Sequence, residues 1–182
     1  MDKTTLSREA WLQRSLDVLR EEGIQGVRVE RLARDLGVTK GSFYWHFDDR
    51  DDLHRSLLKF WVERFNDVVT ENPAFQSADP AAGLLEAITK VREEELDKYE
   101  LAIRAWAEHD SEAGKTVRDL YERRATFIRS FFSRIGFRGL DAEIRTRLTL
   151  CFLSWDPSMH PDESESRRLK LLKLQHELLT KK

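Results

Sequence analysis

The chain has 182 residues, of which 35% are charged and 40% hydrophobic, and its formal net charge is −2. A chain of this length holds one domain or two small ones, and a charge so near zero counts only weakly against binding to nucleic acid. No apolar run is long enough to cross a bilayer, no signal-peptide core follows Met1, and the single cysteine, Cys151, excludes an intramolecular disulfide, so we expect a cytoplasmic protein.

Two short amphipathic helices are predicted near the N-terminus. The first ends at Gly23 and carries an apolar stripe with two further apolar residues beside it: Leu12, Leu16, Leu19, Trp11 and Val18. The second has apolar residues at positions i, i+3, i+4 and i+7, namely Val29, Leu32, Ala33 and Leu36. Gly37 follows at the position where helices commonly end in a left-handed residue, so we expect a tight turn there.

A third helix is predicted from Thr39, a good N-cap, to Phe47. Only Val38, Phe43 and Phe47 are spaced to bury on one face. The other side chains of the segment carry hydroxyls, charges and rings suited to phosphates and base edges: Thr39, Lys40, Ser42, Tyr44, Trp45 and His46. Helix, glycine turn and capped helix make a helix-turn-helix, whose second helix is placed for the major groove of DNA.

The stretch from about Ser7 to Leu58 resembles the DNA-binding domain of the TetR family of bacterial transcriptional repressors. The matching residues are Leu32-Ala33, the run Gly37-Val38-Thr39-Lys40-Gly41-Ser42-Phe43-Tyr44, His46-Phe47, Arg50 and Leu53. The resemblance implies that Tyr44 and His46 contact phosphates, that Trp45 touches bases, and that Arg50 clamps the sugar-phosphate strand. Many relatives cap the preceding helix with Ser or Thr; this chain has Arg28, which we expect to reach a phosphate directly.

The small and basic residues of the segment fit the same chemistry. Gly41 has no Cβ and lets a phosphate approach the backbone, Thr39 and Ser42 offer hydroxyls, and Lys40 adds positive charge. The alternative is that Thr39 only caps the helix, that Tyr44 only packs, and that His46 is an ordinary surface histidine. For Thr39 both roles are compatible, whereas for Lys40, Tyr44 and Trp45 the sequence favours contact with DNA.

Helical periodicity continues to the C-terminus. A long helix is predicted from Asp51 to Val69, and further helices follow after Pro80, around residues 101–107, up to Ile135, up to Trp155 and after Pro161. Strand signals are nearly absent. The predicted fold class is therefore all-α, with an N-terminal three-helix helix-turn-helix domain over residues 1–50. The resemblance implies that the helical remainder, residues 51–182, is a ligand-binding and dimerisation domain.

The last two predicted helices carry more apolar surface than one neighbour can cover. The resemblance implies a homodimer in which these helices pair with their symmetry mates, through Ile144, Leu148, Phe152, Trp155, Leu169, Leu172, His176 and Leu179. A helix that caps only its own domain is the alternative. A twofold dimer reads a palindromic operator on double-stranded DNA, with half-sites roughly 34 Å apart. Cys151 lies on the same apolar stripe and is predicted to be a buried small residue.

The resemblance also implies a small-molecule effector that binds the C-terminal domain and shifts the two DNA-binding heads. The long helix from Asp51 to Val69 is the expected transmitter. The candidate pocket residues are Trp61, Phe65, Arg104, Trp106, Tyr121 and Phe127. Two alternatives stay open: the aromatic residues belong to the core, and Arg104 pairs with an acid among residues 93–95.

Enzymatic activity is not expected. The five histidines are scattered without metal-ligand spacing, and the sequence has no glycine-rich phosphate loop, nucleophile elbow or Cys-x-x-Cys motif. We therefore expect no metal and no cofactor. A DNA-binding regulator that works without a ligand, or an adaptor whose C-terminal helices dock another protein, uses the same residue types and is the alternative function.

Overall fold

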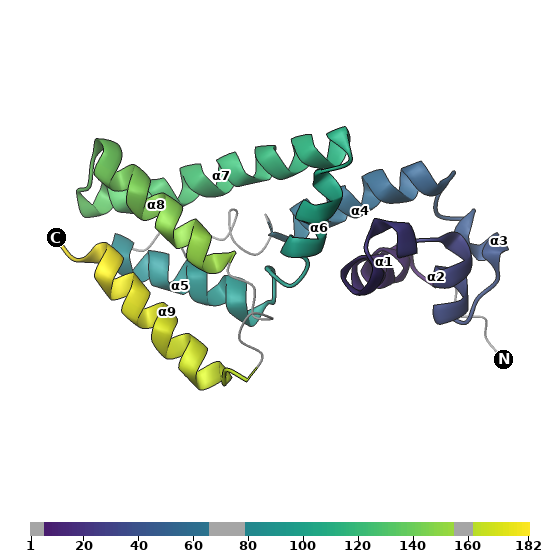
Figure 1. Cartoon of the computed structure of the whole chain (residues 1–182), viewed down its shortest axis with the longest axis horizontal. Helices are drawn as coiled ribbons and strands as arrows, with labels where there is room; N and C mark the ends of the chain where they lie inside the picture. Colours follow the sequence, from purple (N-terminus) through teal and green to yellow (C-terminus); the bar gives the residue numbers. More distant parts are fainter. Residues whose placement is uncertain (1–5, 66–78, 155–161) are drawn as a thin grey trace. The chain divides into compact units, whose positions relative to one another are not determined.

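The computed structural model describes residues 6–65, 79–154 and 162–182, with the side chain of Phe65 excepted. Every regular element in these ranges is helical, which confirms the predicted all-α fold (Figure 1). The helices are α1 (Arg8–Glu22), α2 (Val29–Asp35), α3 (Lys40–Phe43), α4 (Arg50–Phe65), α5 (Pro80–Glu93), α6 (Glu100–Ala107), α7 (Ser111–Ile135), α8 (Gly139–Leu153) and α9 (Glu165–Thr180), with a short 3-10 turn, η1 (Ile24–Gly26), after α1.

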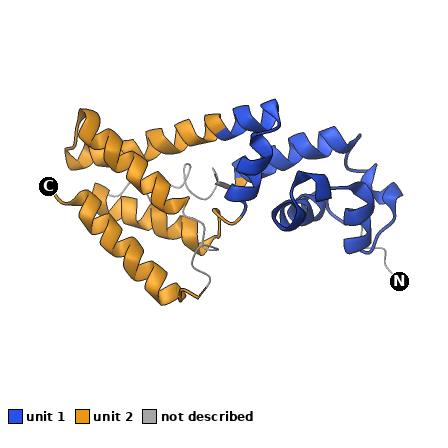
Figure 2. Ribbon diagram, viewed as in Figure 1, with its two compact units in different colours: residues 1–63, 99–117 blue, residues 64–98, 118–182 orange. Residues whose placement is uncertain are grey.

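The helices form two compact units, each built from segments that are distant in sequence (Figure 2). Unit 1 contains Met1–Glu63 and Tyr99–Val117, and unit 2 contains Arg64–Lys98 and Arg118–Lys182. Helix α6 and the first turns of α7 therefore belong with the helix-turn-helix, although they lie far along the chain. The predicted domain boundary at residue 50 concerns domains that follow one another in sequence, which these two units are not. That boundary stays a prediction.

Three aromatic residues, Trp11, Phe43 and Phe47, pack together in the otherwise largely aliphatic core of unit 1. The rings of Trp11 and Phe43 meet edge to face with centroids 5.5 Å apart, and Phe43 stacks on Phe47 at 5.2 Å. Trp11 and Phe43 are fully buried and Phe47 is 2% exposed, so the predicted burial of both phenylalanines is confirmed. Aromatic pairs of this kind stabilise a small core beyond the area that they bury, and here they hold α1 against the segment that begins with α3.

Several helix ends follow directly from the sequence. Gly23 and Gly37 have φ of 73° and 68°, the left-handed conformation that glycine adopts without strain. Asp79 caps α5 by accepting a hydrogen bond from the Ala81 N–H at 2.9 Å, with Pro80 in the first turn. Ser164 caps α9 in the same way, through the Arg167 N–H. These local signals set the elements before any tertiary contact is considered.

In unit 2, α9 packs against both α5 and α8. The buried apolar side chains include Leu84, Ile88, Phe131 and Phe132. The imidazole Nε2 of buried His176 lies 2.8 Å from the carbonyl oxygen of Ala81, a contact that joins α9 to the start of α5. Within the described ranges, no helix combines the length and the apolar character that a bilayer crossing requires.

Candidate nucleic-acid interface

The turn between α2 and α3 has the geometry that the sequence predicts. The N–H of Gly37 donates to the Arg34 carbonyl at 3.2 Å, and the N–H of Val38 donates to the Ala33 carbonyl at 2.9 Å. With Gly37 in the left-handed region, these two bonds close α2 and reverse the chain. Residue Thr39 then stands at the N-cap of α3 with extended backbone, but its hydroxyl makes no capping hydrogen bond. The predicted N-cap position of Thr39 is therefore confirmed, although the capping hydrogen bond from its side chain is absent.

Helix α3 is shorter than predicted. It spans Lys40–Phe43, and residues 44–46 form a turn rather than a second helical turn. The N–H groups of His46 and Phe47 both donate to the Phe43 carbonyl, at 2.9 and 3.1 Å. Both bonds end on the same carbonyl oxygen, and the regular hydrogen bonding of α3 does not continue beyond this point. The chain then runs on to α4. We call residues 44–46 the recognition turn.

The polar side of α3 and the recognition turn point to solvent. Trp45 is 85% exposed and Tyr44 is 64% exposed, although both carry large rings. The Tyr44 ring touches buried Phe43 edge to face, with centroids 5.2 Å apart, which fixes its direction. Thr39 and Gly41 are also exposed. A tryptophan left this open on the surface gains nothing from folding, and such exposure is typical of a binding surface.

Lys40 lies in an ion pair on this surface. Its Nζ is 2.5 Å from Glu30 Oε1, and both side chains are more than half exposed. The hydrogen bond from Lys40 holds the pKa of the Glu30 carboxyl below its usual value. Exposed pairs of this kind contribute little to stability. Lys40 can therefore exchange Glu30 for another anion at small cost.

His46 presents less of its ring than the resemblance implies. The side chain is half-buried, and Nε2 is buried without a hydrogen-bond partner among the described residues. Nε2 is therefore not available to a phosphate in this conformation. Ser42 is likewise half-buried, with its N–H donating to the Thr39 carbonyl at 3.0 Å.

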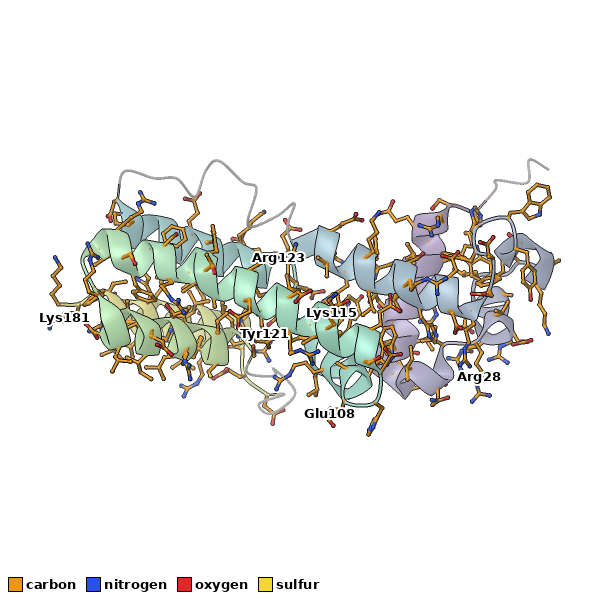
Figure 3. All side chains as sticks on the ribbon, turned by 90° about the horizontal axis from the view of Figure 1, so that it is seen from above. Arg28, Glu108, Lys115, Tyr121, Arg123 and Lys181 are labelled. Carbon is orange, nitrogen blue, oxygen red and sulfur yellow. The ribbon has the colours of Figure 1, made fainter. Side chains whose placement is uncertain are left out.

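The two predicted arginines lie at helix starts. Arg28 is exposed at the N-cap of α2, and its Nε donates to the Gln25 carbonyl at 2.8 Å (Figure 3). Arg50 is the exposed first residue of α4. Arg31, which could have joined this face, pairs instead with Asp35 at 2.7 Å.

One residue at this surface was missed by the sequence analysis. Arg8 donates from Nε to the His46 carbonyl at 3.3 Å and from Nη2 to Ser56 Oγ at 2.6 Å. Its guanidinium carbon also lies 4.8 Å from the centre of the Phe47 ring. The partners are 38 and 48 residues away along the chain, so no local pattern could have identified it.

The six candidate pocket residues are divided between the units. Buried Trp61 and Trp106 belong to unit 1 with exposed Arg104, and Trp106 meets the His54 ring at 5.3 Å. Half-buried Tyr121 and Phe127 belong to unit 2, where the Tyr121 hydroxyl lies 3.1 Å from Ser154 Oγ (Figure 3). The side chain of Phe65 lies outside the described residues. A shared pocket stays a prediction.

The predicted dimer residues lie on different faces. Ile144, Leu148 and Leu169 are exposed, Phe152 and Leu179 are half-buried, and Trp155 lies outside the described residues. Leu172 and His176 are buried in the core of their own protomer, and this part of the prediction is wrong because α9 turns them toward its own neighbours.

The neighbouring stripe of α9 faces out instead, through Leu171, Leu174 and Leu178. Cys151 is exposed, so its predicted burial within the protomer is also wrong. In the part of the chain that the structure describes, no group of three or more His, Cys, Asp or Glu side chains is placed to hold a metal ion.

Residues 12–57 match the family model described as "Bacterial regulatory proteins, tetR family". The chain is similar to the HTH-type transcriptional regulator AcrR of Shigella flexneri, with 28% identity over 87 residues, which are 48% of this chain and 40% of AcrR. It is also similar to the HTH-type transcriptional repressor AcnR of Corynebacterium glutamicum, with 34% identity over 71 residues, 39% of this chain and 38% of AcnR. The chain spans about two fifths of the length of these curated relatives.

Several solved structures share the complete fold. A transcriptional regulator from Rhodococcus sp. Rha1 has a TM-score of 0.78 over 96% of both chains, at 21% identity. AibR in complex with isovaleryl coenzyme A and operator DNA has a TM-score of 0.75 over 95% of this chain and 97% of AibR, at 14% identity. FadR from Bacillus subtilis in complex with stearoyl-CoA has a TM-score of 0.66 over 96% of this chain and 98% of FadR, at 16% identity.

Proposed function

The chain belongs to the TetR family of bacterial regulatory proteins, and we propose that it is a homodimeric DNA-binding repressor that a small-molecule ligand releases from a palindromic operator. The observation that carries this proposal is the exposed side of α3 and the recognition turn. Trp45 and Tyr44 stand in solvent beside Lys40, directly after a glycine turn. Buried Phe43 and Phe47 hold this surface from behind.

Each side chain of the surface has a chemical role in this proposal. Lys40 exchanges Glu30 for a phosphate, and the hydroxyls of Thr39 and Ser42 donate to neighbouring phosphate oxygens. Trp45 reaches into the major groove, where its ring packs on a thymine methyl group or its N–H meets a base acceptor. The remaining phosphate contacts come from Arg28, Gly41, Tyr44, His46 (through Nδ1) and Arg50.

Dimerisation is part of the proposal because one four-residue helix meets too few bases for useful specificity. Helices α8 and α9 expose large apolar side chains in rows at helical spacing: Leu140, Ile144 and Leu148 on α8, and Leu171, Leu174 and Leu178 on α9. Soluble monomers rarely leave so many apolar side chains in solvent. A second copy of the chain, related by a twofold axis, covers both rows at once.

The effector completes the proposal. AibR and FadR have the same fold and were solved with coenzyme A thioesters, which supports this ligand class as the first to be tried. The ligand must bind the DNA-incompetent state better than the competent one to release the operator. Helix α6 packs on α1 within unit 1, so a change at α6 is transmitted to the helix-turn-helix.

Selection of fragments from a random DNA pool by the purified protein, followed by sequencing, tests the DNA-binding function. We expect a palindromic consensus. Lys40→Ala should weaken binding to all sequences and lower the salt slope by about 1 per protomer, whereas Trp45→Ala should change the preferred bases. A pool that shows no enrichment would overturn the proposal.

Thermal unfolding in the presence of isovaleryl-CoA, stearoyl-CoA and a wider metabolite set tests the effector. Binding to the folded state raises the melting temperature, and an inducer also lowers operator affinity. If no compound stabilises the protein while DNA binding is intact, the regulator works without a ligand or serves as an adaptor.

A further inference from the structure

The guanidinium of Arg8 joins three separate segments of unit 1. Arg8 is the first residue of α1, and it donates to the carbonyl of His46 in the recognition turn and to the hydroxyl of Ser56 on α4. The same guanidinium lies over the ring of Phe47 at 4.8 Å. A planar group with several donors in fixed directions can make these contacts together, which a lysine ammonium cannot.

Further hydrogen bonds connect Ser56, through Asp52, to the backbone of Asp48, which directly follows Phe47. The Ser56 hydroxyl donates to Asp52 Oδ1 at 3.5 Å, and Asp52 Oδ2 accepts from the N–H of Asp48 at 3.2 Å. The chain of contacts Arg8–Ser56–Asp52–Asp48 therefore holds the backbone just after Phe47. Arg8 itself holds the backbone just before Phe47, through the His46 carbonyl.

The recognition turn depends on such outside support. Helix α3 has four residues and ends where two N–H groups share the Phe43 carbonyl, and a helix this short has little stability of its own. The direction of Trp45 is therefore set by the contacts that anchor the turn to α1 and α4. Arg8 makes two of these contacts, and Phe43 and Phe47 supply the apolar ones.

We propose that Arg8 is a positioning residue that fixes the recognition turn through its hydrogen-bond geometry and so determines operator preference without itself neutralising a phosphate. The proposal rests on the DNA-binding function proposed above. The competing role is a direct phosphate contact, since Arg8 is exposed near the same surface. A lysine at position 8 keeps the positive charge but not the guanidinium geometry, so it should preserve a phosphate contact but not the positioning role.

Salt titration separates the two roles because each phosphate contact adds about 0.9 to the slope of log K against log salt. With the operator from the random-pool selection, Arg8→Lys should lower the preference for operator over unrelated DNA about 3- to 10-fold, with an unchanged salt slope. Arg8→Ala should do the same. Lys40→Ala, as the matched control for a phosphate contact, should lower the slope.

Ser56→Ala provides an independent variant that alters no charge. It removes one anchor of Arg8, so operator preference should fall in the same direction while the salt slope stays at the wild-type value. The proposal is overturned if Arg8→Lys retains full operator preference, or if Arg8→Ala lowers the slope as Lys40→Ala does. If the wild-type protein enriches no sequence at all, the DNA-binding function fails and this proposal with it.

Discussion

The phenol oxygen of Tyr99 donates a 2.7 Å hydrogen bond to Asp17 Oδ1 and accepts a 2.7 Å bond from the amide of Gln13. Tyr99 is only 2% exposed and precedes α6, whereas its two partners lie on α1. A buried hydroxyl that is satisfied on both sides is costly to disturb. This contact therefore ties the N-terminal end of α6 to the first helix of the DNA-binding module.

Tyr99→Phe should lower the free energy of unfolding by about 1–3 kcal/mol, because it leaves the Asp17 and Gln13 groups without their shared partner. Urea unfolding followed by circular dichroism measures this. Tyr44→Phe is the matched control: the Tyr44 ring is 64% exposed, so the same chemical change should alter stability by less than about 0.5 kcal/mol. If Tyr99→Phe changed the free energy of unfolding as little as Tyr44→Phe, the two hydrogen bonds of the Tyr99 hydroxyl would contribute nothing to stability.

The His54 ring predicts a pH dependence of stability. It meets buried Trp106 edge to face, and burial lowers the pKa of His54 below its ordinary value of 6.5, with a smaller contribution from Arg50. The carboxylates of Asp51 and Asp110 act in the opposite direction. The folded protein therefore favours neutral His54. Above about pH 6.5 the imidazole is neutral in both states, and as the pH falls below that value the unfolded chain takes up the proton first.

His54→Gln should consequently reduce the loss of stability between pH 7.5 and pH 5.5. The comparison is made by urea unfolding of both proteins at the two pH values, and the difference between them isolates the His54 contribution. Asp110, whose carboxylate caps α7 through the Ala113 N–H, also has a lowered pKa, but it acts below about pH 3.8 and lies outside this window. Parallel stability changes in the two proteins would contradict the assignment.

Local patterns predicted those features of the fold that depend on neighbours in sequence. The left-handed turn at Gly37 was predictable because glycine has no Cβ, and the burial of Phe43 and Phe47 was predictable from their helical spacing. The end of α3 was misplaced because the alternation of polar and apolar residues is the same in a helix and in the turn of residues 44–46. Residue type placed Thr39 correctly at the N-cap of α3, but residue type does not fix whether its hydroxyl makes the capping hydrogen bond.

The remaining errors concern contacts between distant segments. Arg8 meets partners in the recognition turn and α4, which nothing in its own neighbourhood indicates. On α9, leucines occupy two adjacent stripes, so helical spacing could not decide which stripe faces α5 and α8. The structure buries the stripe of Leu172 and His176. Cys151 was predicted to be buried because it lies on an apolar stripe of α8, but the spacing of that stripe does not tell which side of α8 faces the core. In the protomer Cys151 is exposed.

Glu30 should lower the affinity for DNA because it competes with phosphates for Lys40. Its carboxylate lies 2.5 Å from Lys40 Nζ, and it must be displaced before Lys40 meets a phosphate. Glu30→Gln should therefore raise affinity for any DNA sequence by about 2- to 10-fold at low salt. The double variant Glu30→Gln/Lys40→Ala is the control, because the gain must vanish when the lysine is absent. A gain that persists in the double variant would mean that Glu30 repels DNA directly.

In the proposed homodimer, the two leucine stripes of α9 should have separate roles, one in dimerisation and one in folding. Leu174 is 52% exposed and Leu172 is 2% exposed, so the two positions, two residues apart on one helix, should respond differently. Leu174→Glu should leave the protomer folded but shift the protein from dimer to monomer in sedimentation experiments, because it places a charge in the apolar contact with the second copy. Leu172→Ala should instead lower the free energy of unfolding by about 2–5 kcal/mol, since it leaves a cavity in the core.

The thiol of Cys151 offers a direct readout of the proposed dimer interface. It is exposed on α8 in the isolated protomer, near the exposed row of Ile144 and Leu148 along the helix. In a dimer built from this face, maleimide should react with Cys151 more slowly at high protein concentration than at low concentration. In Leu174→Glu the reaction should be fast at every concentration, because no second copy covers the thiol. A wild-type rate independent of concentration, with a dimer still present in sedimentation, would place the interface on another surface.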